Sequence, residues 1–127
     1  DMGDGVGSIR DKLTHILGAE KIWLERLLGN PGAFLTADHV ADLPTLQQLW
    51  AEAEQGWVDF LDGQTNETLN DVFRYKDLKG NEHQSKLWSI LTHVTNHGTY
   101  HRGQAASLVR RLAGKPPVTD YIAFSRL

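Results

Sequence analysis

Residues 86–113 read KLWSILTHVTNHGTYHRGQAASLVRRLA, and a regular apolar seam runs along them. Its positions alternate steps of four and three residues: Leu87, Leu91, Val94, Gly98, His101, Ala105, Leu108 and Leu112. Such alternation keeps one helix face against its neighbours in an antiparallel bundle. Ser85 is a typical N-cap residue, and Gly114 followed by two prolines would end the helix. We therefore expect one long helix over about residues 86–113, with this seam in the core.

Two further helices are expected, over about residues 8–28 and 44–63. Ser8 and Asp11 have the spacing of a capping box, and Gly29 would stop the first helix. Pro44 suits the first turn of the second helix, which should end near Gly63. The apolar residues recur at helical steps in both stretches: Ile9, Leu13, Ile16, Leu17, Trp23, Leu24, Leu27 and Leu28, then Leu46, Leu49, Trp50, Ala53, Trp57, Phe60 and Leu61.

Between the second and third helices, residues 71–84 predict a short β-hairpin. Val72, Phe73 and Tyr75 favour a strand, and the sequence 79–81, Lys-Gly-Asn, is a turn signal. The fold class expected from the whole pattern is an all-α antiparallel helical bundle with a short β-hairpin insertion. The 127 residues suit a single domain, residues 1–127.

Composition excludes several classes of function. The net charge is -3 and no basic stripe is evident, so we expect no nucleic-acid partner. The sequence has no cysteine, which rules out disulfides, a thiolate nucleophile and cysteine-ligated metals. No apolar run reaches the roughly 20 residues of a membrane helix, and no signal peptide is recognisable, so a cytoplasmic protein is expected. The zincin, nucleophile-elbow and Walker motifs are also missing.

Three histidines recur every four residues on the long helix: His93, His97 and His101. His101 falls on the apolar seam, His97 lies beside it, and His93 is rotated further towards the edge. Buried imidazoles need partners, and one metal ion would satisfy the pair His97 and His101. The plainer alternative is hydrogen-bonded core histidines. Gly98, between the two rings, would leave room for a ligand or simply allow close helix packing.

A metal site needs at least one more ligand. His15 on the first helix is one candidate, and Glu20 on the same helix is the other, giving a two-His, one-carboxylate set suited to non-haem iron. A haem held by His15 and either His97 or His101 is a third possibility. We expect His39 and His83 to be solvated, in a loop and in the hairpin.

Residues 13–24, LTHILGAEKIWL, and 93–104, HVTNHGTYHRGQ, resemble the DinB-like family, as does GKPPVTDY at 114–121. The resemblance implies a four-helix bundle with helix directions up-down-down-up, often a homodimer. It also implies a divalent metal held by His15, His97 and His101, with His93 not a ligand. The family begins with a helix of about 30 residues ahead of the position of Gly7. That helix is not recognisable here, where residues 1–7 look like a loop.

The resemblance implies an enzyme acting on a small molecule, either a metal-dependent hydrolase or an S-transferase that uses a thiol such as bacillithiol or mycothiol. Zinc or nickel is the expected metal, with iron as an alternative. The competing hypothesis is a non-catalytic, metal-stabilised bundle that serves as a stress-response or binding module. Further residues expected near the metal or in the pocket are Glu20, Trp23, His93, Asn96, Tyr100, Arg102 and Gln104.

Overall fold

The computed structural model of the protein describes residues 7–127. These residues form three long helices, α1 (Ile9–Leu27), α2 (Leu43–Asp62) and α3 (Leu87–Ala113), and a one-turn helix, α4 (Tyr121–Phe124). Strands β1 (Val72–Lys76) and β2 (Glu82–Lys86) pair as an antiparallel hairpin. The expected fold class, a mainly helical bundle with a hairpin insertion, is confirmed. Of the loop expected at residues 1–7, residues 1–6 lie outside the described residues.

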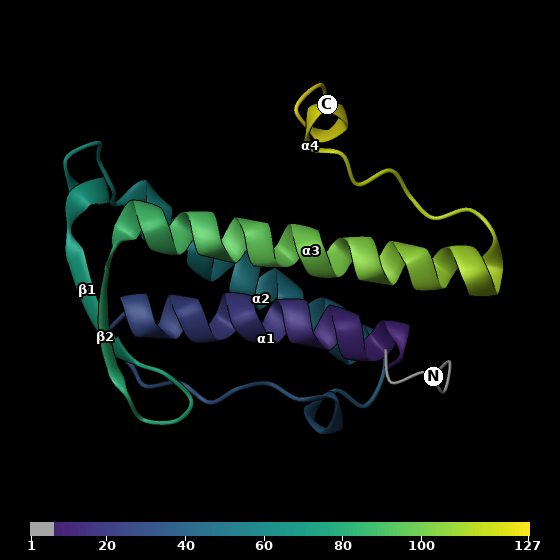
Figure 1. Ribbon diagram of the computed structural model, residues 1–127, viewed down its shortest axis with the longest axis horizontal. Helices are drawn as coiled ribbons and strands as arrows, with labels where there is room; N and C mark the ends of the chain where they lie inside the picture. Colours follow the sequence, from purple (N-terminus) through teal and green to yellow (C-terminus); the bar gives the residue numbers. More distant parts are fainter. Residues whose placement is uncertain (1–6) are drawn as a thin grey trace.

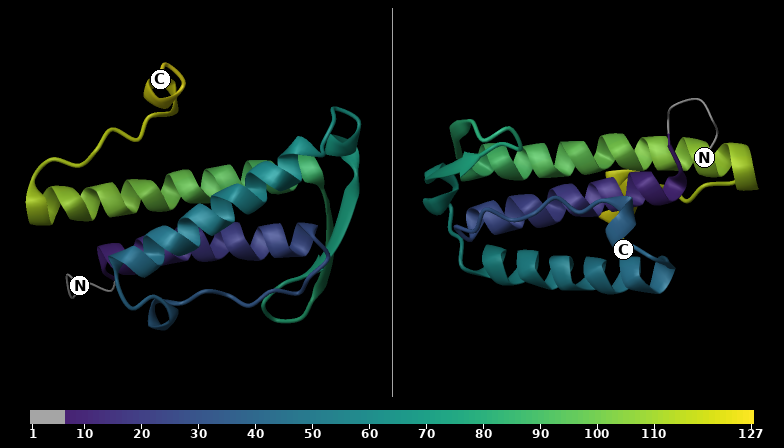
Figure 2. Two further views of the ribbon diagram at one scale, coloured as in Figure 1. Left: turned by 180° about the vertical axis from the view of Figure 1, so that it is seen from behind. Right: turned by 90° about the horizontal axis from the view of Figure 1, so that it is seen from below.

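Helix α1 is the centre of the bundle, since α3 packs on one side of it and α2 on the other (Figures 1 and 2). Helices α1 and α2 run in the same direction, because the segment between them returns along the length of α1. Helix α3 runs the opposite way. This down-down-up order agrees with the last three helices of the expected up-down-down-up arrangement.

The start of α1 confirms the capping box expected from sequence. The Ser8 hydroxyl accepts a hydrogen bond from the Asp11 backbone N–H at 3.1 Å, and the Asp11 carboxylate accepts one from the Ser8 N–H at 2.8 Å. At α2 the cap is Asp42, whose carboxylate accepts a bond from Thr45 N–H at 2.8 Å, and Pro44 lies in the first turn. Each cap satisfies backbone donors that have no partner inside the helix.

The prediction that Ser85 caps α3 is wrong. Ser85 belongs to β2, where it faces Phe73 in the strand register, and its hydroxyl hydrogen-bonds the Tyr75 hydroxyl at 3.1 Å. Strand β2 passes straight into α3, so Lys86 takes the cap position without any side-chain bond. A serine ahead of an apolar run signals a cap only when the chain turns there, and here the sheet holds it extended.

Two apolar clusters make up the core. One joins α1 to α2 and the connecting segment through Leu17, Val40, Leu46 and Ala53. The other lies at the hairpin end of the bundle, where the following side chains surround Leu27, Leu87 and Ile90: Trp23, Trp57, Phe60, Leu69, Phe73, Tyr75, Leu91 and Val94. The seam of α3 is buried at Gly98, Ala105 and Leu108.

The far end of α3 departs from the sequence expectation. Leu112 continues the predicted seam but is 60% exposed, because the last turns of α3 extend past the start of α1 (Figure 1). Beyond Gly114, which has φ of 92°, the chain leads to α4, which stands away from the helices and is exposed. None of the described helices combines the length and hydrophobicity needed to cross a membrane.

Candidate metal centre

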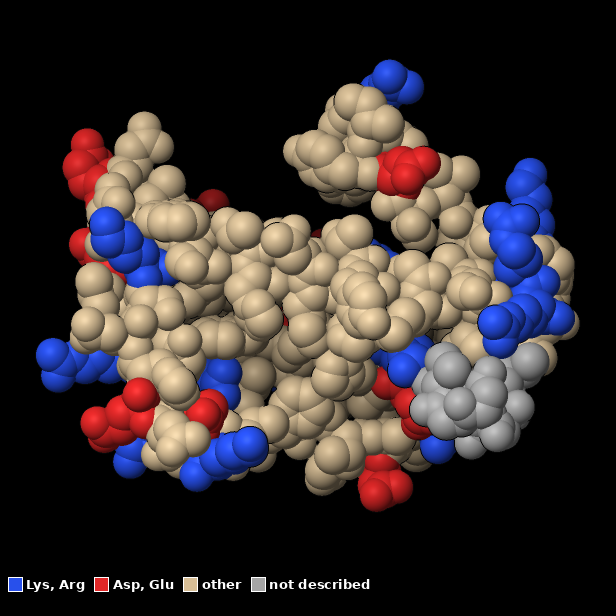
Figure 3. Space-filling view, viewed as in Figure 1, with Lys and Arg blue, Asp and Glu red and all other residues tan. Residues whose placement is uncertain are grey.

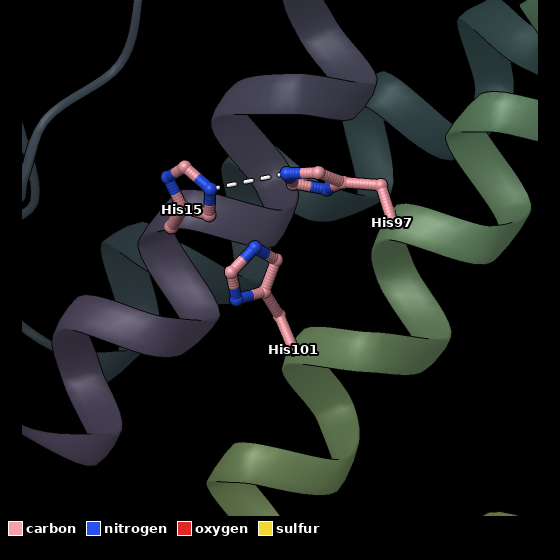
Figure 4. A group of neighbouring side chains, drawn as sticks. All are labelled: His15, His97 and His101. Carbon is pink, nitrogen blue, oxygen red and sulfur yellow. Dashed lines mark hydrogen bonds between the residues drawn. The ribbon is translucent and has the colours of Figure 1, made fainter. Parts of the chain in front are cut away.

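Three histidine side chains meet where α1 packs against α3 (Figure 4). His15 comes from α1, and His97 and His101 come from successive turns of α3. Each ring offers a nitrogen within 4.8 Å of a nitrogen of the other two. The ring centroids of His97 and His101 are 4.4 Å apart, and that of His15 lies 4.9 Å and 4.4 Å from them.

The helical repeat explains two members of this group. Side chains four residues apart on a helix project side by side, which places the His97 and His101 rings together without help from the rest of the fold. The antiparallel contact of α1 with α3 supplies His15, which is 82 residues away from His97 in the chain. All three side chains are partly buried, so they lie between the helices rather than on the open surface.

Burial lowers the pKa of two imidazoles of the group, those of His97 and His15. The pKa of His97 falls to about 4, first because burial disfavours the charged ring and then because His101, His15 and His93 would repel its positive charge. Burial, followed by the charges of His101 and Lys12, also lowers the pKa of His15. His15 and His97 are therefore neutral at pH 7, the state in which an imidazole can bind a metal ion.

The closest contact in the group tests whether it fits a metal. Nε2 of His15 and Nε2 of His97 are 3.1 Å apart. Without an ion, one of these nitrogens must carry a proton and donate it to the other. With both nitrogens deprotonated, their lone pairs would repel each other unless a cation lay between the rings. Three neutral nitrogen donors at this spacing fit a divalent transition metal ion, and they also fit the simpler hydrogen-bonded pair.

Gln104 holds the third ring in place. Its side-chain oxygen lies 2.7 Å from Nδ1 of His101, one turn along α3. Because the amide oxygen is an acceptor, Nδ1 of His101 must be the donor, which leaves Nε2 as a lone pair. This is the kind of partner that fixes the tautomer and orientation of a metal-binding histidine. The structure thus brings Gln104 to the group in the role expected of an orienting residue.

Glu20 lies outside the histidine group. Burial raises the pKa of its carboxyl group, while the charge of Arg102 and a hydrogen bond from Trp50 of α2 act in the opposite direction. Arg102 itself lies over Gly98, where an added Cβ would come within 2.8 Å of its guanidinium. The space left by Gly98 is therefore occupied by the guanidinium of Arg102.

A cavity of about 440 Å³ opens beside the histidine group. Trp23 and His93 line it together with His97, and the rings of Trp23 and His93 are in edge contact at 5.3 Å. Asn96 and Tyr100 are exposed and do not line it, although the Tyr100 ring touches His101 at 5.0 Å. Of the expected pocket residues, the structure thus brings Trp23 and His93 to the cavity.

The remaining two histidines lie far from the group in the chain and are exposed. His39 bonds to the backbone N–H and hydroxyl of Thr36, and His83 pairs with Asp77 at 2.9 Å. The structure places both where the sequence suggested, in the connecting segment and in the hairpin.

Sequence reasoning missed the residues that other segments bring to the cavity. Phe34 approaches the His15 ring at 5.7 Å from the connecting segment, and Arg26, Asp77 and Lys79 line the cavity from the end of α1 and the hairpin turn. No local pattern marks them, because each reaches the cavity through tertiary contacts. Arg26 shares a helical face with His15 and was the one residue whose position could have suggested a role.

The comparisons with known proteins agree with the resemblance noted above. The model of the DinB family matches residues 1–127. Protein DinB of Bacillus subtilis (strain 168) is 25% identical over 122 residues, a match that covers 90% of this chain and 70% of that protein. No solved structure matches the chain at a significant level.

Proposed function

The chain belongs to the DinB family, and from this membership and the histidine group we propose that it binds one divalent transition metal ion through His15, His97 and His101. We propose further that it is a metal-dependent enzyme acting on a small molecule, as a hydrolase or as a thiol S-transferase of the bacillithiol or mycothiol type. The alternative, a non-catalytic metal-stabilised module, shares the same site and differs in what the ion does.

One observation carries the metal proposal. Three ring nitrogens from two antiparallel helices come within 4.8 Å of one another, and at least two of the rings are neutral at pH 7 because burial lowers their pKa. Gln104 would hold the His101 ring with Nε2 free. A hydrogen bond between His15 and His97 would pair only those two nitrogens and would not require the third ring to converge on them.

The donor set also bears on the choice of metal and on the chemistry. Three neutral imidazoles suit zinc or nickel, and the position of Glu20 outside the group makes the two-His, one-carboxylate iron site the less favoured alternative. A haem would need its two axial nitrogens on opposite sides of the iron, whereas these nitrogens converge. A divalent ion with three neutral ligands and an open position would supply Lewis acidity and lower the pKa of water or a thiol.

The protein's own contribution is to keep His15 and His97 neutral, to orient the His101 ring, and to offer a cavity beside the group. The side-chain oxygen of Gln104 accepts a hydrogen bond from Nδ1–H of His101. Trp23 and His93 form a wall of the cavity next to His97. A substrate in this cavity would lie against His97, so its reacting group would be next to the metal position.

The decisive experiment measures metal content by plasma mass spectrometry on untagged protein after exposure to zinc or nickel. We expect about one equivalent in the wild type and none in the His97→Ala/His101→Ala double variant. His93→Ala is the matched control, because it removes a neighbouring ring on the same helix and should leave the metal content unchanged. Equal loss in the control and the double variant, or no metal in the wild type, would contradict the assignment.

Activity separates the enzymatic proposal from its alternative. We expect the zinc- or nickel-loaded protein to hydrolyse activated esters or amides, or to transfer a small thiol to an electrophile such as monochlorobimane. The double variant should lose this activity, while His93→Ala should keep its metal. A fully loaded protein that is inactive in both assays, and whose cobalt-substituted spectrum does not respond to added thiol, would favour the non-catalytic module.

A further inference from the structure

The cavity beside the histidine group carries positive charge at the end away from His97. His93 and His97 of α3 line one part of it, and Arg26, at the end of α1, lines another part together with Lys79 of the hairpin turn. Two full positive charges therefore lie in its wall, against one acidic side chain, Asp77. The proposed function uses none of these three residues.

The guanidinium of Arg26 packs against aromatic rings, and among the described residues no carboxylate forms an ion pair with it within 4 Å, although the charge of Asp77 attracts it from further away. Its central carbon lies 4.5 Å from the centroid of the Trp23 ring and 5.4 Å from that of Tyr75. Its Nε is buried and has no hydrogen-bond partner among the described residues. Buried donors in folded proteins are nearly always satisfied, so an unsatisfied one calls for an explanation. The Trp23 and Tyr75 rings are in edge contact with each other at 4.8 Å, so the guanidinium packs against both from one side, which leaves its cavity side for a planar anion.

The Asp77 carboxylate does not serve as the planar anion that would pair with Arg26. One of its carboxylate oxygens accepts hydrogen bonds from the backbone N–H groups of Lys79 and Asn81, both at 2.9 Å. The other accepts from the Asn81 amide at 3.0 Å and lies 2.9 Å from Nε2 of His83. No ion pair within 4 Å joins Arg26 to Asp77 in the described part of the chain. The carboxylate of Asp77 is thus occupied in shaping the hairpin turn.

The distance between Arg26 and the histidine group sets the length of a ligand that contacts both. Arg26 follows His15 by eleven residues, which is close to three helical turns, so both lie on one face of α1 about 16 Å apart along its axis. Ring contacts bridge this interval, from Trp23 under Arg26 to His93 at 5.3 Å and from His93 to His97 at 5.7 Å. A molecule that touches both ends must therefore be elongated and lie along these rings.

We propose that Arg26 binds a carboxylate group of the substrate, and that the substrates of this protein are elongated acids whose reacting end lies at the histidine group. The carboxylate would complete the hydrogen bonding of a guanidinium that Trp23 and Tyr75 already hold in place, and Lys79 would add a second positive charge. The position of the reacting end rests on the proposed function, whereas the contact at Arg26 does not require a metal.

The contact is tested first on metal-free protein, by following the Arg26 Nε–H resonance in nitrogen-15 NMR, assigned with Arg26→Lys. We expect sodium succinate to shift this resonance saturably, and neutral succinamide at equal ionic strength to leave it unchanged. The resonance of Arg110, exposed on the far end of α3, serves as the internal control. Equal shifts at both arginines, no shift at Arg26, or a larger shift with inorganic phosphate would overturn the carboxylate assignment.

The second measurement asks whether one molecule reaches both ends. Calorimetry on zinc-loaded protein would compare glutathione, a thiol that carries two carboxylates, with its diethyl ester. We expect glutathione to bind at least about tenfold more tightly, and Arg26→Gln to abolish this preference while Arg110→Gln keeps it. Equal binding of the two probes, or binding of neither, would overturn the proposal that one molecule contacts both Arg26 and the histidine group. Zinc content, measured on every sample, shows separately whether the metal site itself has failed.

Discussion

His97 shows how the neighbours of a residue decide its chemistry. Its spacing from His101 places two rings side by side, yet spacing alone says nothing about their charge. Burial between α1 and α3, followed by the charges of His101, His15 and His93, lowers the pKa of His97 to about 4. A solvated histidine would be partly protonated near pH 6.5. The fold thus prepares this side chain to act as a neutral donor.

The lowered pKa predicts how the stability of the metal-free protein depends on pH. In the unfolded chain His97 titrates near pH 6.5, so between about pH 6.5 and 4 the unfolded state binds more protons than the folded state. The free energy of unfolding should therefore fall as the pH drops through this window, by about 1 to 2 kcal/mol, since the partly exposed ring is screened by solvent.

Urea denaturation at pH 7.5, 6 and 4.5 measures this effect. His97→Gln should flatten the dependence in that window, because its side chain does not titrate. His39→Gln, at an exposed histidine outside the group, should keep the full slope. Identical slopes in the wild type and His97→Gln would show that the pH dependence arises elsewhere.

Gln104 offers a second prediction about an individual residue. Replacing it with Ala removes the acceptor 2.7 Å from Nδ1 of His101, which frees the ring to rotate or change tautomer. We expect zinc affinity, measured by competition with a chelating dye, to fall by about tenfold or more. Gln104→Glu keeps an acceptor oxygen and should retain most of the affinity. An unchanged affinity in Gln104→Ala would remove this residue from the site.

Among the elements, α1 comes close to the backbone of the segment that follows it. At Gly18 an added Cβ would lie 2.9 Å from the backbone oxygen of Leu35, in the segment that also carries Phe34 to the His15 ring. Backbone cannot move aside as a flexible side chain can, so this glycine sets the distance between α1 and the connecting segment. Gly103 of α3, by contrast, has open space around it.

The same substitution should therefore have opposite effects on the two helices. We expect Gly18→Ala to lower the free energy of unfolding by about 1 to 3 kcal/mol, through overpacking against Leu35. Gly103→Ala should raise it by about 1 kcal/mol, because alanine favours a helix interior without any new contact. Thermal unfolding of the two variants beside the wild type gives the comparison, and a stabilised Gly18→Ala would contradict the close approach.

For the molecule as a whole, a bound ion would tie α1 to α3 across most of the chain. Ligands that bind only the folded state stabilise it by mass action, by about 2.7 kcal/mol at a hundredfold excess over Kd. We expect zinc or nickel to raise the melting temperature by roughly 10 °C. The His97→Ala/His101→Ala variant should show no rise, whereas His93→Ala should respond as the wild type does. A rise in all three proteins would indicate binding elsewhere.

The homodimer implied by the family resemblance stays a prediction, and one surface is suited to it. The central part of the face in Figure 3 carries few charged side chains. On α3 the hydroxyls of Thr92, Thr95 and Thr99 donate to backbone oxygens of their own helix, so their methyl groups and Trp88 make an exposed uncharged stripe. Sedimentation should give about twice the 14.2 kDa chain mass, and Thr95→Glu should shift it towards the monomer.

The sequence by itself determined the helices, the hairpin turn and the pairing of His97 with His101, because these depend on neighbours within one or two turns. The capping box at Ser8 and the turn at Gly80 are local in the same sense. The error at Ser85 marks the limit, since only strand pairing with β1 shows that the chain stays extended there.

Only the tertiary structure decided what lies opposite these local features. Periodicity placed His15 on the flank of its helix and could not choose between it and Glu20, because the choice depends on how α1 rotates against α3. Periodicity placed the small residue Gly98 on the seam without showing that the side chain of Arg102 lies over it. Periodicity placed Arg26 on the same helical face as His15 without showing that a cavity lies there, since the hairpin and α3 complete that wall from distant parts of the chain. Distances between segments come from packing, which local sequence does not encode.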